Sequence, residues 1–192
     1  MNLSSKTFSS IKWSVGSGIV QKLISFAGTV ILARILEPSV FGLFALAFVA
    51  IDTLGLFKSM GFDTALIQRK DDIQRASNTA FITIPLLGFA IYAVLFIASP
   101  LIASFFNNKE LVNVLKVLGI YFILSCFARV PTVILEKQMQ FDKLSICELV
   151  SSSAFSLSAV VFAYFDLGIW SLVHAFLIRM LINTAMVWAY SH

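Results

Sequence analysis

Charged residues are scarce in this sequence. Only 12% of its 192 residues are Asp, Glu, Lys or Arg, whereas hydrophobic residues make up 59% and the mean hydropathy is +0.92. A water-soluble domain is roughly one quarter charged. The chain therefore lacks the polar surface that such a domain needs. This excludes the ordinary soluble classes and indicates a membrane protein.

Residues for covalent or metal chemistry are equally sparse. The two cysteines, Cys126 and Cys147, lie in apolar stretches at a spacing that matches no metal motif, so we expect buried, inert thiols. The sequence has no phosphate-binding glycine loop, no HExxH pair and no carboxylate cluster with metal-ligand spacing. The serines between residues 151 and 158 have no base at a useful spacing. We expect neither an enzyme nor a bound metal or cofactor.

The positive charge of the chain does not form a nucleic-acid footprint. The net charge is +4, from 14 basic and 10 acidic residues. The basic residues are spread thinly at the ends of the apolar stretches, as membrane orientation requires, and they form no basic stripe. We therefore expect membrane lipids around the chain and no nucleic acid as a partner.

Long apolar runs fill the sequence, and two of them meet at a short hinge, Leu32–Leu43, with Pro38 at its centre. Proline lacks an amide donor and disfavours helix at the preceding Glu37, so the first helix should end here. A bilayer-spanning helix needs roughly 20 apolar residues, so the chain holds about six. The predicted helices span residues 11–36, 40–60, 79–106, 111–135, 144–164 and 170–190. The predicted fold is an all-α integral membrane protein in which residues 1–192 form one six-helix bundle.

The basic residues predict an orientation. Six spans return the chain to its starting side, so both termini face the same compartment. The predicted loops on that side collect most of the Lys and Arg residues, whereas the opposite side holds mainly Arg34 and Lys109. By the positive-inside rule the N-terminus lies in the cytoplasm. The residues on the basic side are Lys6, Lys12, Lys58, Arg69, Lys70, Arg75, Lys137 and Lys143.

Three charges fall near the middle of predicted spans: Lys22, Asp52 and Arg179. At the helical rise per residue, Lys22 and Arg179 are each roughly 15 Å deep, counted from opposite faces. A charge at bilayer centre costs around 3 kcal/mol or more. Either Asp52 neutralises Lys22 or Arg179 in a buried pair, or the two cations bind an anionic substrate while Asp52 tunes the site. Ammonium and guanidinium groups suit phosphate oxygens, and both interpretations stay open.

Polar residues of the first predicted helix fall on one stripe. A stripe of Ser, Gly and Thr allows close helix packing, whereas Gln21 and Lys22 are costly against lipid and indicate a polar cavity. The stripe consists of Ser14, Ser17, Gly18, Gln21, Lys22, Ser25 and Thr29. His174 also has two interpretations, a proton relay or a packed residue on an apolar helix.

Four segments carry a resemblance to a known family. They are residues 32–43, with the pattern Ala-Arg-x-Leu-x-Pro-x-x-Phe-Gly-Leu, residues 61–69, the pair Val130-Pro131 with Phe141, and residues 168–173. The chain resembles the bacterial polysaccharide flippases of the multidrug/oligosaccharidyl-lipid/polysaccharide exporter superfamily. The resemblance runs in order through nearly all of the sequence. The family often has Gly before the hinge proline, where this chain has Glu37.

The resemblance implies a fold and a function. Such flippases have two helical bundles around a central cavity, so this chain corresponds to the N-terminal bundle and lacks a C-terminal partner or pairs with a second copy. They move undecaprenyl-diphosphate-linked oligosaccharide from the cytoplasmic to the outer leaflet of the bacterial inner membrane. By position, Lys22 matches a cavity cation of the family, and the expected substrate site adds Gln21, Asp52 and Arg179. The alternatives are a multidrug exporter of the same superfamily and a non-transporting scaffold for polysaccharide assembly.

Overall fold

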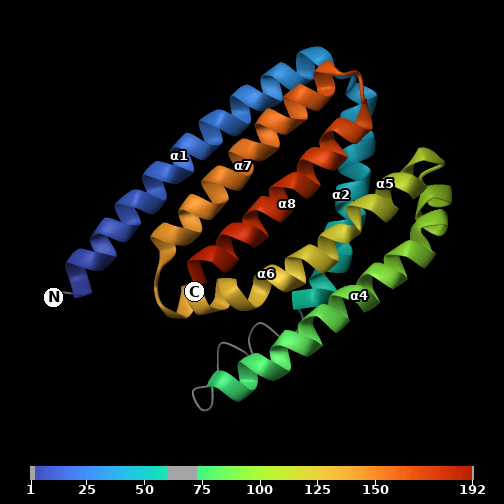
Figure 1. The fold of residues 1–192 in the computed structure, drawn as a ribbon. Coiled ribbons are helices and arrows are strands. Elements are labelled where there is room, and N and C mark those ends of the chain that lie inside the picture. Colours follow the sequence, from blue (N-terminus) through green and yellow to red (C-terminus); the bar gives the residue numbers. More distant parts are fainter. Residues whose placement is uncertain (1–2, 60–72, 192) are drawn as a thin grey trace.

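The computed structural model describes residues 3–59 and 73–191, with side chains at residues 16, 18–56 and 84–191. Within these ranges the chain is helical and contains no strand. The helices, labelled in Figure 1, are α1 (Leu3–Ile35), α2 (Pro38–Ser59), α4 (Ile73–Phe105), α5 (Glu110–Leu118), α6 (Ile120–Lys137), α7 (Phe141–Tyr164) and α8 (Ile169–Ser191). The family-like segment at residues 61–69 lies outside the described residues.

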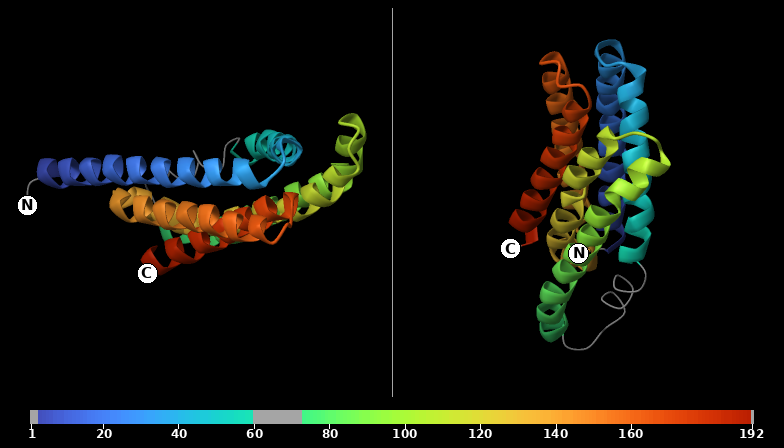
Figure 2. Two further views of the ribbon diagram at one scale, coloured as in Figure 1. Left: turned by 90° about the horizontal axis from the view of Figure 1, so that it is seen from above. Right: turned by 90° about the vertical axis from the view of Figure 1, so that its right-hand side faces the viewer.

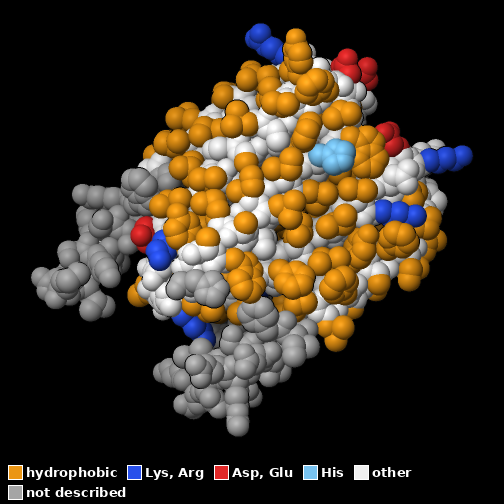
Figure 3. Space-filling model, viewed as in Figure 1, with side chains coloured by type: hydrophobic (Ala, Val, Ile, Leu, Met, Phe, Trp, Pro, Cys, Tyr) orange, Lys and Arg blue, Asp and Glu red, His pale blue; other side chains and the backbone are white. Residues whose placement is uncertain are grey.

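The described residues contain six stretches that are long and apolar enough to cross a membrane. The predicted all-α integral membrane fold is therefore confirmed. Its charged side chains gather mostly near the helix ends, and hydrophobic side chains cover the face shown in Figure 3. α4 begins at Ile73 rather than at residue 79, so the end of the predicted polar loop is helical.

The predicted helix over residues 111–135 is two helices, α5 and α6, which meet at Gly119 and together form one span. A Cβ atom at Gly119 would lie 2.8 Å from Tyr92 Cδ2 and 2.9 Å from Leu95 Cδ2. Glycine at the break therefore lets α4 approach closely. This packing requirement depends on α4 and is not visible in the sequence around Gly119.

The α1–α2 hinge lies where the sequence predicts it. α1 ends at Ile35 and α2 begins at Pro38, whose missing amide costs nothing at the start of a helix. The Val40 amide donates to the Glu37 carbonyl at 3.0 Å, and Ser39 Oγ donates to Glu37 Oε2 at 3.2 Å. The chain therefore reverses direction within two residues.

The helices form a layer with two helices against one side of it. α7 packs between α1 and α8, α8 packs on α6, and α6 packs on α4. Figure 2 shows α1 and α2 on one side of the layer formed by α7, α8, α6 and α4. From their shared hinge they diverge, since α1 packs along α7 while α2 packs on α5, α4 and α8. The N-terminal end of α1 and the C-terminal end of α8 lie at the same end of the bundle (Figure 1).

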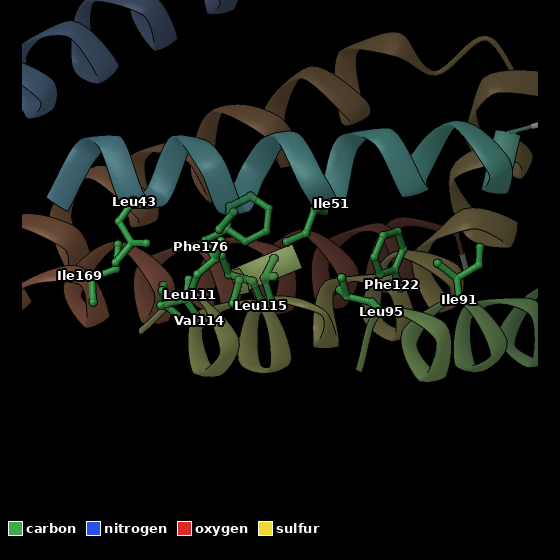
Figure 4. Close-up of a cluster of buried hydrophobic side chains, with 14 residues drawn as sticks. Leu43, Ile51, Ile91, Leu95, Leu111, Val114, Leu115, Phe122, Ile169 and Phe176 are labelled. Carbon is green, nitrogen blue, oxygen red and sulfur yellow. The ribbon is translucent and has the colours of Figure 1, made fainter. Parts of the chain in front are cut away.

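The largest apolar core lies where α2 meets α4, α5, α6 and α8 (Figure 4). Phe122 is fully buried, and the ring of Phe176 packs edge-on against Phe44 and Phe48 at centroid distances of 6.5 and 5.5 Å. Lipid tails are as apolar as these side chains, so close packing rather than water exclusion holds such helices together. This core fixes α2 against α8, which positions part of the candidate site.

Three helices end with the same cap. After α4, α6 and α7 the chain turns through a residue with positive φ, at Asn107 (51°), Met139 (54°) and Asp166 (55°). In each case the next amide donates back to a carbonyl five residues earlier, as Gln140 does to Leu135 at 3.0 Å. This is the Schellman arrangement, which favours Gly or Asn at the turning residue. Met139 therefore carries the greatest backbone strain of the three.

Candidate functional site

Gln21 faces α7 because of how α1 packs. At Gly28 the two helices touch so closely that an added Cβ would lie 2.9 Å from Ser156 Cβ, and Leu32 and Leu36 continue the buried face. Gln21 lies two helical turns before Gly28 and shares this face. Part of the predicted polar stripe is thus a close-packing surface against α7. The side chains of Ser14 and Ser17 are outside the described residues.

A carboxylate on α7 joins three helices. Gln21 Nε2 donates to Glu148 Oε1 at 3.2 Å, and Arg179 Nη2 of α8 donates to the same oxygen. Gln21, Glu148 and Arg179 are called the Glu148 cluster below. About one turn after Glu148 on α7 and after Arg179 on α8, Asn183 Nδ2 donates to Ser151 Oγ at 3.4 Å. Two of the residues proposed from the sequence, Gln21 and Arg179, are thereby brought together through a third.

The Glu148 cluster is partly buried and incompletely satisfied. The Arg179 and Glu148 side chains keep 29% and 42% of their surface exposed. Glu148 binds Arg179 through one oxygen and one terminal nitrogen. Arg179 Nε is buried and has no hydrogen-bond partner in the described part of the chain. A buried donor without an acceptor costs about 1–3 kcal/mol, so this guanidinium retains capacity for another oxyanion.

The alignment of α7 against α8 shows how far the Arg179 side chain extends along its helix to contact Glu148. Cys147 packs with Val187, and Ser151 contacts Asn183, so Glu148 lies level with residue 186 of α8. The Arg179 backbone is therefore about two turns, roughly 10 Å, from the level of Glu148. Its long side chain leans along α8 towards the end where the chain termini lie, as snorkelling arginines do. The pair spans this offset because both side chains extend along the helices.

Asp52 does not neutralise either cation. No ion pair joins Asp52 to Lys22 or Arg179 among the described residues, and Asp52 is exposed. The buried pair, one of the two interpretations that the sequence leaves open, does not form among the described residues. Glu148, on the directly packed helix α7, binds Arg179, and aromatic rings fill the contact between α2 and α8. Asp52 is nevertheless one turn along α2 from Phe48, whose ring packs against Phe176 of α8.

Lys22 stands apart from the Glu148 cluster. It is exposed, and it makes no hydrogen bond or ion pair with the described residues. One residue is about 100° on a helical wheel, so Lys22 lies beside the face that Gln21 presents to α7. The structure thus shows one cation held by a carboxylate and another cation available for an anion.

Sequence reasoning overlooked Glu148. Counted from the start of its helix, Glu148 is only roughly 10 Å deep, so its depth does not single it out. The sequence feature that points to Glu148 is Arg179 itself. A deep cation requires a nearby acceptor, and α7, which carries Glu148, is joined to α8 by a short turn. His174 is exposed and lies beside the rings of Trp170 (5.7 Å) and Phe162 (6.1 Å), so both of its interpretations stay open.

The arrangement suits binding of an anion. Among the described residues, no group of three or more His, Cys, Asp or Glu could hold a metal ion, and both cysteines are buried free thiols. The guanidinium and ammonium groups can bind oxyanions, and Gln21 adds a neutral hydrogen-bonding group.

A family model described as "Polysaccharide biosynthesis protein" matches residues 31–192. The chain is 26% identical over 186 residues to the lipopolysaccharide biosynthesis protein WzxC of Escherichia coli, covering 97% of this chain and 37% of that protein. It is 25% identical over 181 residues to the succinoglycan biosynthesis transport protein ExoT of Rhizobium meliloti, covering 94% and 37%. The teichuronic acid biosynthesis protein TuaB of Bacillus subtilis is 34% identical over 93 residues, covering 48% and 19%.

The chain thus spans about 37% of the length of WzxC and of ExoT. No solved structure matches it. The segment matched by the family model contains Asp52, Glu148 and Arg179 and begins after Gln21 and Lys22.

Proposed function

The chain belongs to the polysaccharide biosynthesis protein family, and from this premise we propose that it is part of a flippase for lipid-linked oligosaccharide. In this proposal the protein moves an undecaprenyl-diphosphate-linked oligosaccharide from the cytoplasmic to the outer leaflet. The printed names of its relatives support the proposal, since ExoT is a biosynthesis transport protein and WzxC serves lipopolysaccharide biosynthesis.

The observation that carries the proposal is the exposed ammonium of Lys22 on a membrane-spanning helix, which makes no hydrogen bond or ion pair with the described residues. An unpaired cation near bilayer centre costs around 3 kcal/mol or more, so it needs water or an anion beside it. A diphosphate headgroup supplies that anion. Arg179, with a free buried Nε, supplies a second set of donors on α8.

The proposal also specifies how the chain is oriented in the membrane and what completes the transport path. The N-terminus lies in the cytoplasm in this proposal, which the basic excess of the loops predicted on its side supports. The membrane is the bacterial inner membrane, where lipid-linked oligosaccharides are made. The described helices form one bundle, and a C-terminal bundle or a second copy of the chain completes the transport path.

The test is leaflet transfer in inverted membrane vesicles from cells expressing the full-length protein, with Lys22→Ala and Arg179→Ala combined. The double variant should insert normally and lose transfer of the lipid-linked oligosaccharide. Lys109→Ala, which removes an exposed cation from the loop between α4 and α5, is the matched control and should transfer normally. A scaffold would be indifferent to all of these substitutions. Normal transfer by the double variant would therefore refute the assignment of the anion site.

A further inference from the structure

We propose that Glu148 is an internal anion that occupies Arg179 in the empty protein and is displaced from it by the anionic headgroup of the substrate. This inference rests on the proposed function and adds a residue that competes with the substrate. It concerns a carboxylate that the sequence analysis did not place in the site.

The hydrogen bonds of the Glu148 cluster show a pair that is formed but incomplete. Glu148 Oε1 accepts from both Arg179 Nη2 and Gln21 Nε2. The Nε atom of Arg179 remains buried, and no described residue accepts a hydrogen bond from it. An arginine binds a carboxylate or phosphate best through two parallel hydrogen bonds, and here one of those donors is idle. Once the guanidinium leaves Glu148 and Nε is uncovered, a phosphate group that binds Nε and Nη2 together satisfies both donors.

Because the Arg179–Glu148 pair is partly exposed, an incoming anion can replace Glu148 as the partner of Arg179. Glu148 is 42% exposed and Arg179 29% exposed, so the contact is reachable from outside the packed core. Partly exposed ion pairs contribute at most about 1 kcal/mol, because both charges remain partly solvated. A dianionic headgroup can replace such a partner, whereas it could not replace a fully buried one.

The long reach of Arg179 makes the exchange compatible with the fold. The guanidinium leans about two turns along α8 to meet Glu148, so its backbone need not move when the partner changes. Gln21 holds Glu148 from α1 through the same oxygen. After displacement, the carboxylate keeps this neutral partner and its access to water.

The experiment measures binding of farnesyl diphosphate, a short prenyl diphosphate, to the purified full-length protein in detergent, with farnesol as the uncharged control. Glu148→Gln retains size and hydrogen bonding but removes the competing charge. It should bind farnesyl diphosphate about fivefold more tightly than the natural protein, which corresponds to loss of a partly exposed ion pair. Farnesol binding should not change.

Two further variants separate displacement from a general charge effect. In an Arg179→Gln background, Glu148→Gln should produce no gain, because the guanidinium for which it competes is gone. Glu136→Gln removes the acid of another Arg–Glu pair, 3.9 Å from Arg129 near the end of α6, and should leave the affinity unchanged. Glu148→Ala replaces Glu148→Gln if the latter does not yield a monodisperse protein.

Unchanged or weaker binding by Glu148→Gln would overturn the displacement proposal. If the natural protein binds the probe and Lys22→Ala abolishes binding, the proposed anion site survives that result. If neither the natural protein nor Glu148→Gln binds farnesyl diphosphate in preference to farnesol, both proposals fail.

Discussion

The contact between Gly28 and Ser156 determines whether α1 can present Gln21 to Glu148, so it is the most informative place to perturb the packing. A Cβ atom at Gly28 would lie 2.9 Å from Ser156 Cβ and 3.1 Å from its Oγ. Real Cβ atoms do not approach a neighbour that closely, so Gly28→Ala must push α1 away from α7. Overpacking of this kind costs about 1–3 kcal/mol.

Helix propensity acts in the opposite direction. Alanine is favoured over glycine inside a helix by about 1 kcal/mol, so the net effect of Gly28→Ala is a loss of about 0–2 kcal/mol. A double-mutant cycle with Ser156→Gly removes this ambiguity. Ser156→Gly deletes the two atoms that the new Cβ would crowd and leaves Ser156 Cα at 3.6 Å, an ordinary contact. The steric cost of Gly28→Ala therefore disappears while its gain in helix propensity remains. We expect a coupling energy of about 1–3 kcal/mol between the two substitutions.

The assay is reversible unfolding in mixed detergent micelles containing increasing SDS, followed by circular dichroism. Gly18→Ala is the matched control, because Gly18 is on the same helix and an added Cβ there meets nothing within 4 Å. It should be neutral or slightly stabilising. The packing argument is refuted if Gly28→Ala is as stable as Gly18→Ala and Ser156→Gly shows no coupling with it.

Three further predictions concern other contacts. Arg179→Leu should destabilise the fold by at most about 1 kcal/mol, because Glu148 loses its cation but stays partly solvated, and adding Glu148→Gln should recover part of that loss; additive effects in the same unfolding assay would argue against the pair. Met139→Gly should stabilise the protein by about 1 kcal/mol, because glycine tolerates the positive φ of 54° at this exposed cap. Gln138→Gly is its control, since that position has a negative φ, and it should not stabilise. Gly119→Ala should lower stability by about 1–3 kcal/mol through its contacts with Tyr92 and Leu95, and a Leu95→Ala background should reduce the loss; an unchanged midpoint would contradict the close approach of α4.

Much of the fold was accessible from the sequence because its signals are local. Apolar length and the charge deficit identify membrane helices, and Pro38 marks the end of one and the start of the next. The break at Gly119 was not predicted, because it depends on how α4 packs against that position. The same holds for the early start of α4, where polar residues before the apolar run continue the helix.

The candidate site was accessible only in part. Depth selected Arg179 and Lys22, and the polar stripe of the first helix selected Gln21. The structure joins Arg179 and Gln21 through Glu148, and it gives Lys22 no partner among the described residues. Depth misassigned the counter-charge, since it favoured Asp52 on α2 and disregarded the shallower Glu148. An arginine reaches several ångströms along a helix, so its partner is set by side-chain length and helix register rather than by matching depth. Those quantities require the tertiary structure.

The most direct test of the central claim uses the full-length natural protein reconstituted in vesicles. The measured quantity is the rate at which a fluorescent prenyl-diphosphate-linked oligosaccharide moves between leaflets, compared with the same lipid and sugar joined through an uncharged linker. The account predicts protein-dependent transfer of the diphosphate lipid and little transfer of the uncharged one, because Lys22 and Arg179 select the anionic headgroup. Equal transfer of both lipids, or no transfer of either, would contradict it.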